Sequence, residues 1–353
     1  SSQSRGLGDV YKRQETNNTI KNVGLFDLTP FSKFEIKSNQ AHRELQKICT
    51  SNIKNEIGKC VYTHMLNPDG GIETDLTVVC IEKDHFRIIS SAATRERDKF
   101  HINKHLAKDV ELKDVTDDYC VFGVFGPKSR ALMKSISKDN FENDNFRFST
   151  AKYITIEGIK IWTQRLSYVG ELGYELYVKS KDAKKIYELL VNKGKDFNLS
   201  NCGMHAMDIM RMESGFLHWG HDISPEENQY QAGLSFTISS KKEDEFIGKK
   251  ALEKIKKEKI KSRFAMFTLK DSKPGEPLLL HDEPIYLENK IIGRSTSGNY
   301  SFNFRKNLTF GYINNDISNN ELHKKDLFIE VEKKKYPIEI INKPLKQTNF
   351  KNN

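Results

Sequence analysis

The sequence predicts an α+β protein that ends in an all-β barrel. Up to about residue 260, segments that alternate apolar and polar residues, as strands do, are interleaved with segments in which apolar residues recur at helical spacing. Beyond that point, short apolar runs follow one another with turn residues between them, which is typical of a small barrel or sandwich. We therefore expect an α+β domain over residues 15–260 and a β-barrel domain over residues 261–353.

Taken in order, the first domain is expected to contain two hairpins, further strands and several helices. The hairpins cover 62–79, which turns at residues 67–70, and 153–166, which turns at Gly158. Further strands are predicted in the second half of 22–37 and at 85–90, 120–125 and 173–178. Helices are predicted at 39–48, 93–106, from 128 onward, 182–194 and 205–215. In the barrel, strands are predicted at 264–269, 284–287, 291–296, 308–313 and 327–331.

Composition excludes several classes of protein. Hydrophobic residues make up 37% of the 353, enough for real cores, but no continuous apolar run is long enough to span a membrane. The net charge of +9 comes from lysines that are scattered or interleaved with glutamates, as over 253–261, which indicates solvated faces. We expect no nucleic-acid and no membrane partner. The positive field suits an anionic ligand.

The five cysteines are far apart, odd in number and without a C-x-x-C pair. This usage is typical of a reducing compartment, with the cysteines as small core residues. The histidines show no metal-ligand spacing, so no metal site is predicted. The expected location is the cytoplasm, or the mitochondrial matrix in a eukaryote.

Residues 1–14, SSQSRGLGDVYKRQ, look like translated sequencing-adapter sequence. We expect this segment to be non-native and exclude it from the prediction of the fold. On this interpretation the natural protein continues upstream of residue 15.

Residues 70–76, Gly-Gly-Ile-Glu-Thr-Asp-Leu, form the motif with the most chemical content. The two glycines make a tight bend, and the apolar residues that follow mark a strand. Asp75 lies among these apolar neighbours, where a carboxylate is costly to bury unless it has a partner. It is therefore a candidate for binding or proton transfer. A hairpin that turns Asp75 to solvent is the open alternative.

A second motif, SYVGELGYELY at 167–177, identifies a family when it is combined with the first. Eight blocks, in the same order, resemble the folate-binding aminomethyltransferases. These include the T-protein of glycine cleavage and, more closely similar, the C-terminal half of dimethylglycine and sarcosine dehydrogenases. The blocks are NVGLFDLTPFSKF (22–34), VYTHMLNPDGGIETDLTVV (61–79), SSAATRERD (90–98), FGPKSR (125–130), LSYVGELGYELY (166–177), HAMDIMRMESGFLHWGHD (205–222), FIGKKAL (246–252) and GRSTSGNY (293–300).

The resemblance implies a three-subdomain fold that holds tetrahydrofolate centrally and joins a one-carbon unit to it. Asp75 matches the family's catalytic aspartate, which takes a proton from the attacking amine or stabilises developing positive charge. Glu175 matches a glutamate that accepts two hydrogen bonds from the guanidine-like edge of the pterin. Tyr62 and Tyr168 match tyrosines that line the folate site.

Two further residues complete the set that the resemblance implies. Ser91 occupies the position of a pterin contact, and Arg211 falls in the family's helix motif. Each assignment has an alternative. The tyrosines could be core aromatics, and Arg211 could form an ion pair with Asp208 or Glu213. The histidines at 218 and 221 invite a metal or acid–base interpretation, but we prefer a role in loop packing.

Three departures separate this chain from the glycine-cleavage T-proteins. Thr74 and Ser91 stand where those proteins have aspartate and asparagine, and Met207 replaces an arginine, which leaves the contact to the folate tail in doubt. All three point toward the dehydrogenases of methylamine catabolism.

The resemblance therefore predicts an aminomethyltransferase module that accepts a methylene unit from an N-methylated glycine. The sequence contains no G-x-G-x-x-G fingerprint, so FAD is expected only in an upstream domain or a partner dehydrogenase. Two alternatives stay open. One is a stand-alone folate-dependent methyltransferase or demethylase of the same fold. The other is a non-catalytic folate-binding protein, whose usual K-G-C-Y-x-G-Q motif is not found here.

Overall fold

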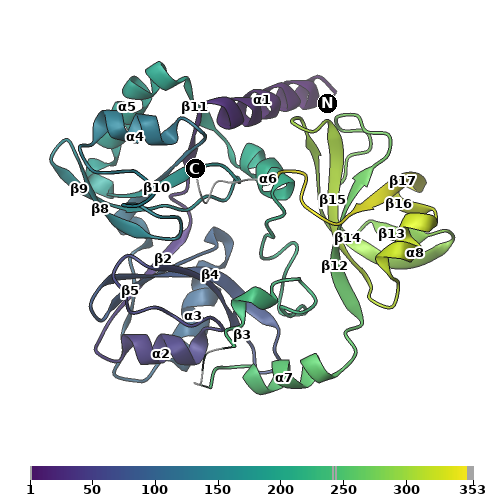
Figure 1. The fold of residues 1–353 in the computed structure, drawn as a ribbon, viewed down its shortest axis with the longest axis horizontal. Coiled ribbons are helices and arrows are strands. Elements are labelled where there is room, and N and C mark those ends of the chain that lie inside the picture. Colours follow the sequence, from purple (N-terminus) through teal and green to yellow (C-terminus); the bar gives the residue numbers. More distant parts are fainter. Residues whose placement is uncertain (1, 241, 243–244, 348–353) are drawn as a thin grey trace.

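The chain folds into two sheet lobes and a barrel (Figure 1). The structure is a computed structural model, which describes residues 2–240, 242 and 245–347. The outer ends of the expected first and last segments, residues 1 and 348–353, lie outside the described residues. No helix in the described part of the chain combines the length and apolar character that crossing a bilayer requires.

The first lobe is a six-stranded sheet in the order β11-β1-β7-β10-β9-β8. Its strands are β1 (Val23–Asp27), β7 (Tyr119–Phe125), β8 (Ala151–Ile156), β9 (Ile159–Gln164), β10 (Gly173–Lys179) and β11 (Leu199–Cys202). Only the β1–β11 pair is parallel. The helices α4 (Ser129–Ile136) and α5 (Ala183–Gly194) bury apolar residues such as Leu132 and Leu190 in its core.

The second lobe is a five-stranded antiparallel sheet in the order β3-β4-β5-β2-β6. Its strands are β2 (Ser32–Lys37), β3 (Cys60–Leu66), β4 (Ile72–Glu82), β5 (His85–Ser90) and β6 (Leu112–Asp114), and its helices are α2 (Ala41–Ile48) and α3 (Arg95–His105). The whole lobe lies in sequence between β1 and β7, which are neighbours in the first sheet. It is therefore an insertion into the first lobe.

A shared core joins the two sheets. This cluster combines Phe26, Phe125 and Tyr177 of the first sheet with Cys60 and Val79 of the second. The helix α6 (Met204–Glu213) adds Ala206, Met207 and Met210 to it. Because one hydrophobic cluster serves both sheets, side chains from β3, β4 and β10 are brought to a common region.

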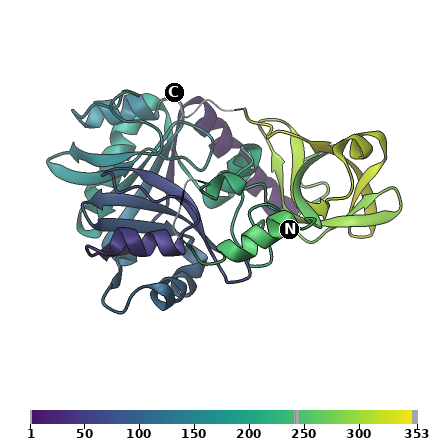
Figure 2. The ribbon, with the colours of Figure 1, turned by 60° about the horizontal axis from the view of Figure 1, so that its bottom comes forward.

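The C-terminal lobe is a closed barrel, which appears as a ring of strands in Figure 2. The strand order is β12-β15-β14-β13-β16-β17, and all neighbours are antiparallel. The strands are β12 (Ser262–Leu269), β13 (Pro284–Leu287), β14 (Lys290–Ser301), β15 (Lys306–Asn314), β16 (Leu327–Val331) and β17 (Lys334–Ile341). The expected α+β class with a C-terminal barrel is confirmed.

Several elements were not predicted from the sequence. These are the strand β1, the short strands β6 and β11, the last barrel strand β17, and the helices α1 (Ser2–Lys21), α7 (Lys249–Lys257) and α8 (Asn319–Lys324). The helix α1 continues through residues 2–14 and lies along α6 and β11. That residues 1–14 are foreign to the natural protein stays a prediction. Of the cysteines, four are buried and Cys120 is partly exposed, with no disulfide.

Candidate active site

The β3–β4 hairpin places Tyr62 beside Asp75. Its loop is closed by Asn67, whose side-chain oxygen accepts hydrogen bonds from the backbone N–H groups of Asp69 and Gly71. In the resulting register Asp75 lies opposite His64, and the Tyr62 hydroxyl donates to Asp75 Oδ2 at 3.3 Å. Burial raises the pKa of Asp75 to about 6, the Tyr62 bond opposes this shift, and the nearby charge of Asp98 adds to it.

Tyr168 belongs to the same region. Its hydroxyl donates to the backbone oxygen of Leu217 at 2.7 Å, and its ring stacks on Phe216 with centroids 5.9 Å apart. Burial raises the pKa of Tyr168, and the charges of neighbouring Asp75 and Asp222 raise it further, opposed by Arg211. Because the Asp75 charge acts on both Tyr62 and Tyr168, the three predicted residues are brought together.

Glu175 approaches the same strand from the first sheet. Its Oε2 accepts a hydrogen bond from the Tyr177 hydroxyl at 3.1 Å, and burial raises the pKa of Glu175 to about 7. The Glu175 charge also contributes to raising the pKa of the Cys60 thiol, which lies two residues before Tyr62 on β3. Side chains two apart on a strand share a face, so Glu175 adjoins the face that carries Tyr62.

These four side chains form the candidate site. Tyr62 keeps 38% of its surface exposed, and Asp75, Tyr168 and Glu175 are half-buried. Yet burial raises the pKa of every one of them. Protein therefore surrounds these groups closely, although solvent still reaches them. The alternative that Asp75 simply points to bulk solvent is not what the structure shows.

Ser91 lies close to the strand that carries Asp75, in a structural position. It follows Ser90, which pairs with Leu76 of β4, and it caps the short helix at Ala92–Thr94 by accepting from the backbone N–H of Ala93 at 3.4 Å. A ligand contact from its exposed edge stays a prediction.

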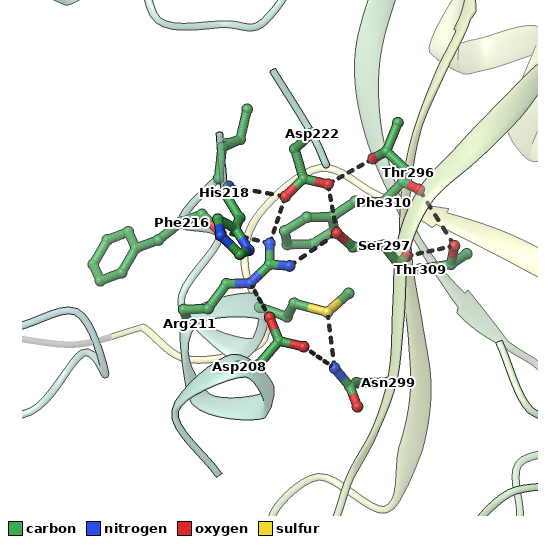
Figure 3. A network of polar contacts seen from close by, with 12 residues as sticks. Asp208, Arg211, Phe216, His218, Asp222, Thr296, Ser297, Asn299, Thr309 and Phe310 are labelled. Carbon is green, nitrogen blue, oxygen red and sulfur yellow. Dashed lines mark hydrogen bonds and ion pairs between the residues drawn. The ribbon is translucent and has the colours of Figure 1, made fainter. Parts of the chain in front are cut away.

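Arg211 lies in the interface between α6 and the barrel (Figure 3), close enough to Tyr168 for its charge to oppose the rise in that residue's pKa. Only 1% exposed, its guanidinium donates to Asp208 Oδ1 at 2.8 Å, Asp222 Oδ2 at 2.5 Å and Ser297 Oγ at 2.8 Å. Its Nη1 also donates to the Phe216 backbone oxygen at 3.1 Å. With all three nitrogens engaged, the geometry favours the ion-pair alternative over a ligand contact. The partners are Asp208 and Asp222, whereas Glu213 instead accepts from Ser301 and Asn303.

The two histidines of this loop pack together, with ring centroids 4.7 Å apart, and the His218 backbone N–H donates to Asp222 Oδ2. Within the described ranges, no cluster of three or more His, Cys, Asp or Glu side chains could hold a metal ion. Sequence reasoning missed three residues that matter to the site: Tyr177, Asp222 and the buried His64. The single available signal was that all three stand inside or beside the family blocks.

Comparison with known proteins identifies the family. The model described as the GCVT N-terminal domain matches residues 8–242, and that of the glycine cleavage T-protein C-terminal barrel domain matches residues 263–346. The chain belongs to the glycine cleavage T-protein family, as the resemblance of the motifs predicted.

Individual relatives divide into two kinds. The aminomethyltransferase of Halothermothrix orenii is 32% identical, covering 86% of this chain and 83% of that protein. The mitochondrial dimethylglycine dehydrogenase of Rattus norvegicus is also 32% identical over 97% of this chain, and the formaldehyde-forming 4-methylaminobutanoate oxidase of Paenarthrobacter nicotinovorans is 34% identical over 91%. This chain spans only 39% and 38% of the length of those two proteins.

A solved structure shares the fold. The glycine cleavage system aminomethyltransferase T from Bartonella henselae superposes with a TM-score of 0.84 at 20% identity, covering 96% of this chain and 90% of that one.

Proposed function

We propose that this chain is a folate-dependent aminomethyltransferase that uses the Tyr62–Asp75 pair to transfer a one-carbon unit to tetrahydrofolate. The supporting observation is a pair of half-buried carboxylates from different sheets with raised pKa values, Asp75 beside Tyr62 and Tyr168, and Glu175 close to Cys60 on the strand that carries Tyr62. When bound, tetrahydrofolate supplies the nitrogen nucleophiles that accept the one-carbon unit.

The residues present suit this ligand. Within the described part of the chain, Tyr177 is the one side chain that donates to Glu175, so the other carboxylate oxygen is open to a ligand. The raised pKa of Glu175 shows that its charge is poorly compensated in the free protein. A pterin edge with two adjacent N–H donors would satisfy it with two charge-assisted hydrogen bonds. Tyr62 and Tyr168 provide aromatic surface beside it.

Asp75 is suited to move a proton. A base works best when its pKa lies near the operating pH, and burial brings the pKa of Asp75 to about 6. Its bond from the Tyr62 hydroxyl fixes one carboxylate oxygen and leaves the other free to take a proton from the attacking amine.

For the donor, we infer an iminium derived from an N-methylated glycine, which would give 5,10-methylenetetrahydrofolate and a free amine. The supporting facts are the similarity to the dimethylglycine dehydrogenase of rat and the three departures from the glycine-cleavage T-proteins at Thr74, Ser91 and Met207. The oxidation that forms an iminium needs a flavin or comparable acceptor, which a further domain or partner would hold.

Calorimetric titration with folinic acid tests the proposal. Wild type should bind without added metal or flavin, and Glu175→Gln should bind more weakly. Glu339→Gln, which changes a barrel carboxylate bonded to Lys306, is the matched control and should bind as wild type does. No heat at millimolar ligand would refute folate binding. Binding without transfer of a methylene unit from formaldehyde and an amine would favour the non-catalytic alternative.

A further inference from the structure

His64 is a buried polar group that the proposed chemistry does not use. It is fully buried, and its two ring nitrogens face two different partners. Nδ1 lies 2.9 Å from Thr237 Oγ1, and Nε2 lies 3.3 Å from the Tyr62 hydroxyl oxygen. That same hydroxyl is 3.3 Å from Asp75 Oδ2. Thr237, His64, Tyr62 and Asp75 therefore form one continuous chain of polar contacts.

The hydrogen-bond directions follow from the far end of this chain. The Thr237 hydroxyl donates to the backbone oxygen of Leu234 at 2.8 Å, so its oxygen is left to accept from His64. His64 thus carries its proton on Nδ1, and Nε2 presents a lone pair to Tyr62. Burial lowers the pKa of His64 to about 3, which keeps the ring neutral throughout the range in which Asp75 titrates.

Tyr62 has one hydroxyl proton and two acceptors for it at equal distance. While Asp75 is ionised, the hydroxyl donates to the carboxylate. Once Asp75 carries a proton it keeps one carbonyl oxygen as an acceptor, but a neutral carbonyl oxygen accepts a hydrogen bond more weakly than a carboxylate does. The unprotonated Nε2 of His64 is then the stronger of the two acceptors. The groups whose charge or pKa is coupled to Asp75 are Tyr62 from β3, Asp98 from α3 and Tyr168 from the loop before β10. Among the described residues, Asp75 and His64 are the two acceptors within hydrogen-bond distance of the Tyr62 hydroxyl.

We propose that His64 is a positioning residue for Asp75: its Nε2 receives the Tyr62 hydroxyl whenever Asp75 is protonated, so that the hydroxyl keeps a strong acceptor in both protonation states of Asp75. The inference deepens the proposed function, because it concerns the same carboxylate. It concerns the ligand-free protein, however, and does not depend on folate binding.

The test follows the Asp75 carboxyl carbon by NMR in ligand-free protein labelled with ¹³C at aspartate carboxyl groups. In His64→Phe the Tyr62 hydroxyl loses its Nε2 acceptor, which destabilises the protonated state of Asp75. The titration midpoint of Asp75 should then fall by about half to one pH unit, the usual contribution of one hydrogen bond. A purely structural role for His64 would lower the melting temperature and leave the midpoint unchanged, and that result would overturn the proposal.

A double-mutant cycle isolates the route. If His64 acts through the hydroxyl, His64→Phe should have no effect on the Asp75 midpoint in a Tyr62→Phe background. An effect of the same size in that background would show that His64 does not act through the Tyr62 hydroxyl, and would refute the proposal.

A third test uses the wild-type protein and therefore does not depend on whether a variant folds. ¹⁵N NMR of the His64 ring should show Nε2 without a proton, and its shift should follow the Asp75 midpoint while the ring stays neutral. A protonated Nε2, or an Nε2 shift indifferent to Asp75, would overturn the proposal. Failure of folinic acid to bind would refute the proposed function and leave these results unaffected.

Discussion

Replacement of Asp222 by alanine should destabilise the joint between α6 and the barrel. Asp222 is fully buried. One carboxylate oxygen accepts from Arg211 and from the His218 backbone, and the other accepts from Thr296 at 2.6 Å and from Ser297 at 2.8 Å. Asp222→Ala would leave a buried guanidinium and three buried donors without this acceptor.

The expected loss is about 3–5 kcal/mol, the usual cost of removing one partner of a buried ion pair. Arg211 would keep Asp208, whose side chain is 37% exposed, so the lower end of that range is expected. Removing the second charge as well, in Asp222→Ala/Arg211→Met, should recover part of the loss, because no uncompensated charge then stays buried.

Urea unfolding followed by tryptophan fluorescence measures this. The chain has two tryptophans, and Trp219 lies in the affected loop, where its indole donates to the Ile72 backbone oxygen at 3.1 Å. A Trp162→Phe background makes Trp219 the sole reporter. Asp316→Ala is the control, because Asp316 pairs with Lys259 at the surface with 51% of its side chain exposed, and such pairs contribute at most about 1 kcal/mol. A loss below about 1 kcal/mol in Asp222→Ala would refute the reasoning.

Three further predictions concern the candidate site. Glu175→Ala should weaken folinic acid binding by at least about tenfold, since it removes charge-assisted hydrogen bonds of about 1.5–3 kcal/mol each. Asp75→Asn should instead lower turnover more than affinity. Calorimetry and a methylene-transfer assay compare the two variants, and the opposite order would mean that the two roles are exchanged. Because burial raises the pKa of Glu175 to about 7, the folded protein holds that proton more tightly than the unfolded chain, so this residue's contribution to stability is lost as the pH rises from about 4 to about 7. The melting temperature of Glu175→Gln minus that of wild type should therefore be larger at pH 8 than at pH 5. An equal difference at the two pH values would contradict the burial of Glu175. The chain alone should not oxidise sarcosine or dimethylglycine. When a flavin domain supplied in trans oxidises the amine to an iminium, this chain with tetrahydrofolate should yield methylenetetrahydrofolate and a free amine, with less formaldehyde released. Oxidation by the isolated chain, or flavin that co-purifies with it, would refute this.

Local patterns in the sequence were sufficient for most elements. The hairpins at β3–β4 and β8–β9 follow from alternation around turn residues, and the barrel follows from closely spaced short strands. The strand β11 could not be predicted, because its four residues form a strand only by pairing with β1, far away in the sequence. Strand β17 opens with lysines and alternates only weakly before Ile338.

The candidate site divides in the same way. Asp75, Tyr62, Tyr168 and Glu175 lie within motifs, so the family resemblance could identify them together. Helical spacing suggested Asp208 as a partner of Arg211, and the structure agrees, but Asp222 reaches Arg211 from a loop whose path the sequence does not reveal. In the sequence His64 looks like an ordinary core residue, because the hydrogen bond that orients its ring is made with Thr237, 173 positions away.

The insertion of the second sheet between β1 and β7 sets an order of assembly on the ribosome. All five strands of that sheet lie between Ser32 and Asp114, so every partner that they need is synthesised before β7 begins. The first sheet, in contrast, must wait for β10 and β11, which end at Cys202. Since domains fold as units while the chain emerges, the inserted sheet can form first. The nascent chain would then carry a finished Tyr62–Asp75 pair before Glu175 has been translated.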